Sequence, residues 1–328
     1  MTRFSVLDLV PVVEGGSIGQ ALNDAAALAV VAEQAGYHRF WVAEHHAMTG
    51  IASAATAVTL AHVGQGTRTI RIGAGGIMLP NHNPFVIAEQ FGTLDALFPG
   101  RVDLGLGRAP GADSRIAHAL RKDLMRSAQD FPHDVVELRA LFEGDSRLPL
   151  QATPGQGAAV EMWILGSSLF GAQLAAALGM PYAFASHFAP DALDDALAIY
   201  RRDFKPSAKL DRPYAMAAIN VFAAATDDEA KFLCSSMDQS FVALRSGNPG
   251  RLKPPVEGFR ETLPPHALSM LEHMRQASAI GSPATVRERV AAFIERTGAD
   301  ELIFAGSTFD PAARVKSLDL AMEACAGL

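Results

Sequence analysis

The chain has 328 residues, of which 49% are hydrophobic, and a formal net charge of −7 at pH 7. This composition can bury a sizeable core and excludes a disordered or fibrous chain. The negative charge, with lysines and arginines scattered along the chain, argues against nucleic-acid binding. No apolar run approaches the roughly 20 residues that a membrane-spanning helix needs, and the N-terminal apolar run is too short for a signal peptide. We therefore expect a soluble, cytoplasmic protein without nucleic-acid or membrane partners.

Short apolar runs alternate with longer Ala- and Leu-rich stretches at helical spacing, a pattern typical of repeated βαβ units around a parallel sheet. An even series of eight strands favours a closed (β/α)8 TIM barrel in a single domain, residues 1–328, over an open, doubly wound sheet. In chain order, the predicted strands are residues 4–10, 39–42, 70–74, 102–106, 162–165, 182–184, 216–222 and 302–305. The predicted helices are residues 20–35, 52–65, 84–98, 114–142, 169–178, 191–204, a long helix after Asp227, 283–297 and 311–324.

Two segments interrupt this pattern. Residues 144–160 are rich in glycine, proline and polar residues and are interpreted as an insertion within the domain. Residues 247–265 contain five prolines and three glycines, which we interpret as incompatible with regular structure. Long loops of this kind are usually lids or binding loops, so we expect a mobile loop here. Cys234 and Cys325 form no CxxC or Cys/His pattern, so neither a disulfide framework nor a structural zinc site is expected.

The active site of such a barrel lies at the C-terminal ends of its strands. Glu44, His45 and His46 directly follow the second strand. Imidazoles beside a carboxylate can transfer protons near neutral pH, although a solvated polar loop is the alternative. Adjacent histidines point in different directions and no third-ligand pattern follows, so no metal is expected. His82, in the turn before the next helix, is interpreted as a surface or capping residue.

Glycines follow the third and fourth strands. Gly73 to Gly76 would let a flat group approach the backbone, unless they form only a strand-end bulge. Gly105 to Gly111 approaches a dinucleotide fingerprint, but Pro110 interrupts the path into a helix and the motif lies at the fourth strand instead of the first. Arg108 is therefore interpreted as an anion ligand.

Small polar residues follow the fifth strand. Gly166, Ser167 and Ser168 precede a predicted helix. Backbone N–H groups at a helix start and two hydroxyls can cradle a phosphate. The alternative is that one serine only caps the helix. A phosphate site facing an arginine from the fourth strand indicates a phosphorylated cofactor.

Taken together, these motifs resemble the luciferase-like flavin monooxygenases, which include bacterial luciferase. The resemblance implies a TIM barrel that binds FMN, used as FMNH2 from a separate flavin reductase. The reduced flavin would react with O2 to give a C4a-(hydro)peroxide that oxidises a small organic substrate. Relatives often form dimers, which implies a homodimer. The resemblance is densest in Ser5–Leu9, Trp41–His46, Gly75–Pro80, Ala88–Arg101, Gly105–Asp113 and Leu165–Ser168.

The resemblance also implies roles for individual residues. His45 would lie beside the reactive flavin edge as a base or hydrogen-bonding group, with Glu44 next to it in the catalytic pair. Gly75 and Gly76 match a non-proline cis peptide that lies against the isoalloxazine. The remaining cofactor-binding positions are Gly107, Arg108, Gly166, Ser167 and Ser168, with Arg126 as a weaker candidate.

The chain departs from luciferase at two of these positions. Gly107 stands where luciferase carries a reactive cysteine, and Ser167 stands where it carries an acid, so the luminescent reaction on long-chain aldehydes is not implied. Two other functions fit the same barrel. One is hydride transfer with the deazaflavin F420, and the other is flavin binding without turnover. Glu44 and His45 argue against the second, because they would have no role there.

Overall fold

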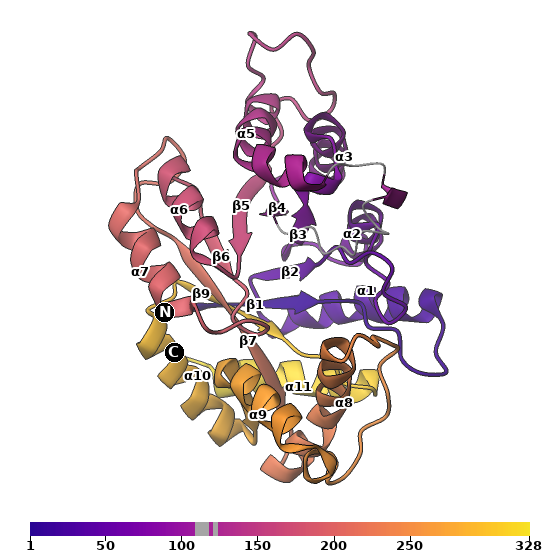
Figure 1. Cartoon of the computed structure of the whole chain (residues 1–328). Coiled ribbons are helices and arrows are strands. Elements are labelled where there is room, and N and C mark those ends of the chain that lie inside the picture. The colour runs from indigo at the N-terminus through magenta and orange to yellow at the C-terminus, as the bar shows by residue number, and fades with distance from the viewer. Residues whose placement is uncertain (109–117, 121–123) are drawn as a thin grey trace.

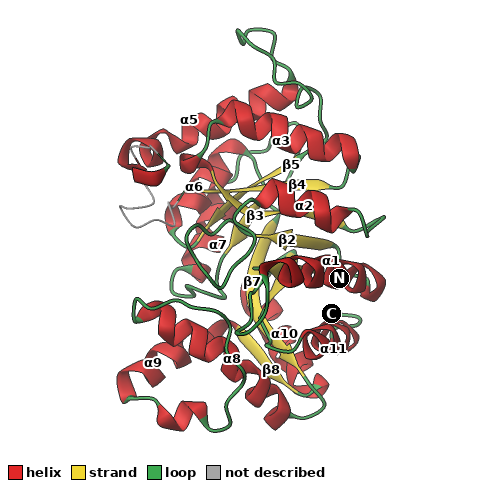
Figure 2. Ribbon diagram, turned by 90° about the vertical axis from the view of Figure 1, so that its right-hand side faces the viewer, coloured by secondary structure: helices red, strands yellow, loops and turns green. Residues whose placement is uncertain are grey.

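The computed structural model describes residues 1–108, 118–120 and 124–328 of the chain. Eight parallel strands close a barrel at its centre (Figures 1 and 2), in the ring order β1–β2–β3–β4–β5–β6–β7–β9 with β9 paired back to β1. The predicted TIM barrel is therefore confirmed, and the open sheet is wrong because the ring closes. The ring strands are β1 Arg3–Asp8, β2 Arg39–Val42, β3 Arg71–Met78, β4 Val102–Gly107, β5 Glu161–Gly166, β6 Tyr182–Phe184, β7 Ala215–Ala223 and β9 Glu301–Ala305.

Helices cover the outside of the barrel, as Figure 2 shows. None of those in the described ranges combines the length and apolar character needed to cross a bilayer. The predicted helical region 114–142 is described in full only from Leu124 onward. The helices are α1 Ile18–Ala35, α2 Thr56–Gly64, α3 Pro84–Leu97, α5 Leu124–Glu143, α6 Leu169–Leu178, α7 Leu193–Asp203, α8 Asp227–Arg245, α9 Pro265–Met274, α10 Pro283–Thr297 and α11 Pro311–Ala324, with short 3-10 turns at Leu79–Asn81, Phe259–Thr262 and Arg275–Ala277.

Local sequence signals begin and end these helices. The Ser17 hydroxyl accepts a hydrogen bond from the Gln20 amide at the start of α1, and Gly36 ends that helix with φ 89°. A left-handed φ is available to glycine at little cost, which makes it a common helix terminator. Asn83 caps α3 in the same way, with Pro84 in the first turn.

A further strand, β8 (Ser278–Gly281), was not predicted. It pairs with the C-terminal end of β7, from Asn220 to Ala223, whereas β9 pairs with β7 from Met216 to Asn220. The expectation that residues 247–265 lack regular structure is wrong in detail, because they contain the 3-10 turn Phe259–Thr262. The mobility of this segment remains a prediction.

The insertion 144–160 projects from the barrel at the top of Figure 1. Its C-terminal part is attached to α3, because the Ala159 amide donates a hydrogen bond of 2.8 Å to the carboxylate of Asp95 in that helix.

Buried charges lie at the N-terminal ends of the strands. The Arg39 guanidinium pairs with Asp103 at 2.8 Å and with Glu301 at 3.1 Å. It also lies over the Trp163 ring, 4.8 Å from its centroid. Arg39, Asp103 and Glu301 are almost completely buried. In a TIM barrel this end serves stability, whereas chemistry takes place at the other end.

Candidate active site at the barrel mouth

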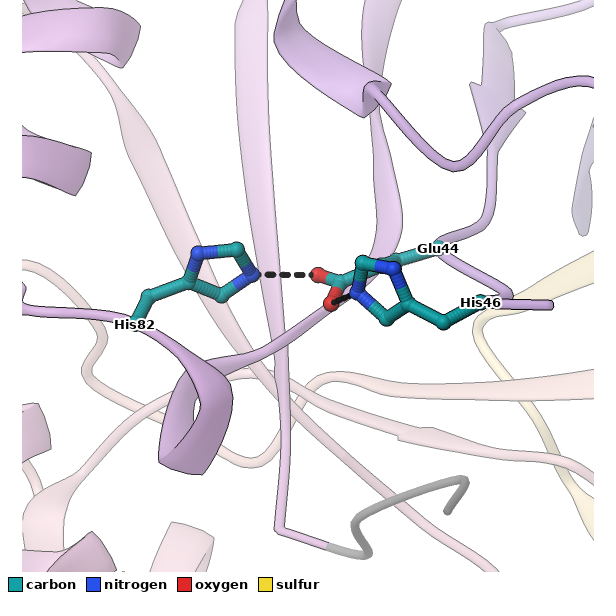
Figure 3. Close-up of side chains that lie close together, drawn as sticks. All are labelled: Glu44, His46 and His82. Carbon is teal, nitrogen blue, oxygen red and sulfur yellow. Dashed lines mark hydrogen bonds and ion pairs between the residues drawn. The ribbon is translucent and has the colours of Figure 1, made fainter. Parts of the chain in front are cut away.

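Glu44 is the centre of a hydrogen-bond cluster at the end of β2 (Figure 3). Its side chain is only 1% exposed, yet its carboxylate accepts four hydrogen bonds. Oε1 accepts from His46 Nε2 at 2.5 Å and from Asn81 Nδ2 at 3.2 Å. Oε2 accepts from His82 Nε2 at 2.8 Å and from the Met78 amide at 3.0 Å. A carboxylate has about four such acceptor positions, so the cluster saturates it.

This arrangement keeps the Glu44 carboxyl ionised. Burial alone would raise its pKa, but the hydrogen bond and charge of His82, together with the other donors, bring that pKa below its usual value. The interpretation of His82 from the sequence, as a surface or capping residue, is therefore wrong, because its ring is hydrogen-bonded to the buried Glu44. The cap of α3 is Asn83.

The same cluster bears on metal binding. Ligand atoms of Glu44, His46 and His82 all lie within 4.8 Å of one another. The sequence argument against a metal relied on the lack of a third ligand, and the fold supplies one in His82. However, the four acceptor positions of Glu44 are already used by N–H donors. The cluster is complete as a hydrogen-bond network, and the expectation of no metal stays a prediction.

His45 points elsewhere. Its Nδ1 is buried and has no hydrogen-bond partner among the described residues. Burial lowers the pKa of His45, and the Ala43 carbonyl and the Glu44 charge offset that effect only in part. The ring is therefore uncharged at neutral pH and is a weaker base than a free imidazole.

Gly75 and Gly76 lie within β3 rather than after it, and the peptide bond between them is cis, as the resemblance implied. The register of β3 against β4 shifts between Gly75 and Ile77, so a bulge is present as well. The Gly76 carbonyl accepts from the Glu44 amide at 3.1 Å. A methyl group on Gly76 would lie 2.5 Å from the Gly105 carbonyl oxygen, so packing alone requires glycine here.

Arg108 is brought beside the loop that follows β5. Its guanidinium lies over the ring of Phe170, in α6, at 3.9 Å from the centroid. Ser168 occupies the N-cap position of α6, but its side chain makes no capping hydrogen bond. The alternative that this serine only caps the helix is therefore not supported. Both Ser167 and Ser168 are exposed.

The other phosphate-site candidates differ in their surroundings. A methyl group on Gly166 would make only ordinary contacts, the nearest at 3.5 Å, whereas one on Gly107 would lie 3.1 Å from Met78 Sδ. Arg126 is exposed and lies 3.9 Å from Asp130. Residues 109–113 of the fourth-strand motif lie outside the described residues.

One histidine of the mouth was missed by the sequence reasoning. His187 follows β6, and its Nδ1 is also buried without a partner in the described part of the chain. Burial lowers the pKa of His187 to about 4. Its place three residues after the predicted strand 182–184 was the signal that could have identified it.

A closed (β/α)8 barrel with Glu44, His45 and Arg108 at the C-terminal ends of its strands is a common enzyme scaffold. A family model described as luciferase-like monooxygenase matches residues 2–301. The chain belongs to this family and is an oxidoreductase by that membership.

Individual relatives agree with this assignment. A luciferase-like monooxygenase of Escherichia coli K12 is 49% identical over 98% of this chain and 96% of its own. The crystal structure of apo-MsnO8 has a TM-score of 0.88 and 32% identity, covering 99% of this chain and 98% of that one. The oxygenating constituent of 3,6-diketocamphane monooxygenase from Pseudomonas putida, solved in complex with FMN, has a TM-score of 0.73 over 98% of this chain and 97% of its own. At 19% identity, this last likeness shows the fold alone.

Proposed function

We propose that the protein is an FMN-dependent monooxygenase that receives FMNH2 from a separate flavin reductase and uses O2 to oxidise a small organic substrate. One observation carries the proposal. Along the consecutive strands β2 to β5, the mouth presents His45, the Gly75–Gly76 peptide, Arg108 and the serine loop in this order. These would be, respectively, a proton-transferring group, a flat backbone surface for the flavin ring and an anion site for the phosphate. Catalysis with FMN needs all three. Membership of the luciferase-like monooxygenase family supports the oxygenase class, and the P. putida protein, which shares the fold, was solved in complex with FMN.

The residues at the end of β5 fit the phosphate. The Ser168 hydroxyl makes no capping hydrogen bond, and together with the N–H groups at the start of α6 it would bind an anion. Arg108, stacked on Phe170, adds a cation beside the same loop.

At the other end of the site, the chain's own residues would manage protons. Reduced FMN, when bound, would supply the two electrons that activate O2. The uncharged His45 ring would hold or transfer a proton at the atom being oxidised. Glu44 would be a positioning residue, since its saturated carboxylate fixes His46, His82 and the turn at Met78 and has no acceptor position left for substrate.

We include a homodimer in this proposal. Val58 on α2 is 72% exposed, and Val86 and Leu97 on the neighbouring α3 are 44% and 59% exposed. These apolar side chains suit a partner surface, and light scattering of the purified protein would measure the mass.

The phosphate assignment is tested by comparing FMN with riboflavin, which lacks the phosphate. The wild type should bind FMN more tightly than riboflavin, and Ser168→Asp should remove that preference by placing a negative charge at the phosphate. Ser168→Ala is the matched control and should keep most of it. Equal binding of both flavins by the wild type would refute the assignment.

A further inference from the structure

Ser53 lies in the loop that follows β2 and is completely buried. Its hydroxyl donates to the Ala43 carbonyl at 2.5 Å and lies 3.3 Å from the carbonyl of Leu9, which directly follows β1. A buried hydroxyl needs such a partner, because it would otherwise lose its hydration without compensation. The Ser53 hydroxyl therefore joins its loop to the backbone just beyond the end of β2.

The peptide unit between Ala43 and Glu44 is held on both sides. Its carbonyl accepts from the Ser53 hydroxyl, and its N–H donates to the Gly76 carbonyl, within β3, at 3.1 Å. Both hydrogen bonds oppose a rotation of this peptide unit. Because the unit directly precedes the side chains of Glu44 and His45, its orientation determines where these two side chains lie at the barrel mouth.

The Ser53 backbone is anchored on each side of the residue. The Ala52 amide donates to the Val10 carbonyl at 3.0 Å. The Thr56 hydroxyl, at the start of α2, donates to the Ser53 carbonyl at 3.0 Å. A hydroxyl on a backbone that is fixed in this way can hold its partner in one orientation.

We propose that Ser53 is a positioning residue of the active site, which acts by fixing the peptide unit that leads into Glu44 and His45. The inference rests on the proposed oxygenase function, in which His45 transfers a proton. Proton transfer depends strongly on geometry, since a misplacement of about 1 Å can cost roughly 100-fold in rate. No atom of Ser53 has to reach the substrate, so complete burial suits this role.

The Ala43 carbonyl also acts on the His45 ring. Burial lowers the pKa of His45, and this carbonyl offsets part of the effect. Without the Ser53 hydroxyl, the carbonyl oxygen would interact more strongly with the ring, and a loosened peptide unit would admit water. Both changes raise the pKa. Glu44 and His46, whose charges also act on this ring, are unchanged by a substitution of Ser53.

The proposal can be tested without flavin, by NMR of the ligand-free protein labelled with ¹⁵N-histidine. The His45 resonances are identified by their loss in His45→Gln and are then followed as a function of pH. Ser53→Ala removes only the hydroxyl. It should raise the proton affinity of the His45 ring about threefold to tenfold, which moves the midpoint of its titration toward the ordinary value of 6.5.

Ser5→Ala is the matched control. Ser5 is also completely buried, and its hydroxyl donates to Glu301 at the opposite, N-terminal end of the barrel. This variant loses a buried hydrogen bond as well, but it should leave the His45 titration unchanged. Equal titrations in wild type and Ser53→Ala, or equal shifts in both variants, would overturn the proposal.

The outcome is separable from that of the proposed function. Normal FMN binding by the wild type together with an unshifted His45 titration in Ser53→Ala would refute only the role of Ser53. A shift confined to Ser53→Ala in a protein that does not bind FMN would refute the proposed cofactor and would still show that Ser53 positions His45.

Discussion

The substitution Glu44→Gln tests the cluster at the end of β2. An amide retains one acceptor oxygen and turns an NH2 donor toward the other pair of partners. In either orientation, one buried donor loses its acceptor, either Asn81 Nδ2 or the Met78 amide. The histidine of the same pair is 25–29% exposed and can change tautomer or bind water. One orphaned buried donor costs about 1–3 kcal/mol, so we expect the free energy of unfolding to fall by about 2 kcal/mol at pH 7.

The pH dependence of this loss has a definite sign. The pKa of Glu44 is lowered in the folded state from its ordinary value of 4.5, so its contribution to stability is fully present above pH 4.5 and disappears as the pH falls through the folded pKa. The gap between wild type and Glu44→Gln should therefore close in acid.

Urea unfolding at a series of pH values measures this gap. Glu288→Gln is the matched control, because it makes the same charge change at an exposed site on α10. The reasoning fails if both variants are equally stable at pH 7, or if the gap for Glu44→Gln does not narrow at all as the pH is lowered from 4.5 into the acid range.

Three other substitutions have defined outcomes. Arg39→Met strands buried carboxylates at the base of the barrel and should cost about 3–5 kcal/mol, whereas Arg289→Met, at an exposed site, should cost little; thermal unfolding compares them. Gly105→Ala would place a methyl group 2.4 Å from the Ala74 carbonyl oxygen and should lower the free energy of unfolding by about 1–3 kcal/mol. Gly19→Ala is the control, because a methyl group there would have no neighbour within 4 Å. A destabilised Gly19→Ala would contradict the packing argument. His45→Gln should retain FMN binding and lose turnover by roughly 10²–10⁴-fold, and unchanged turnover would reject its catalytic role.

The barrel was predictable because each ring strand is an apolar run bounded by turn residues. The fourth and fifth, Val102–Gly107 and Glu161–Gly166, lie within a residue or so of their predicted bounds. Strand β8 (Ser278–Gly281) was not predictable, because it is short and owes its conformation to pairing with the C-terminal end of β7. That pairing is a tertiary contact that local periodicity does not encode.

The site was predictable only where its residues are neighbours in sequence. Glu44 and His45 follow a strand and were identified from that position. The bond between Glu44 and His82 joins residues 38 apart, so a search for ligand spacing within one segment could not detect it. His187 lies three residues after the end of the predicted strand 182–184, so the rule that selected Glu44 could have identified it, but the segment Ala185–Phe188 forms no recognisable motif.

The central claim is most directly tested by anaerobic loading of the protein with FMNH2 or, in parallel, with F420H2, followed by rapid mixing with O2. We predict that FMNH2 binds and that mixing produces a transient absorbance distinct from both oxidised and reduced flavin, with a lifetime shortened in His45→Gln. Binding and hydride exchange with F420H2 alone, without any such transient from FMNH2, would contradict the account.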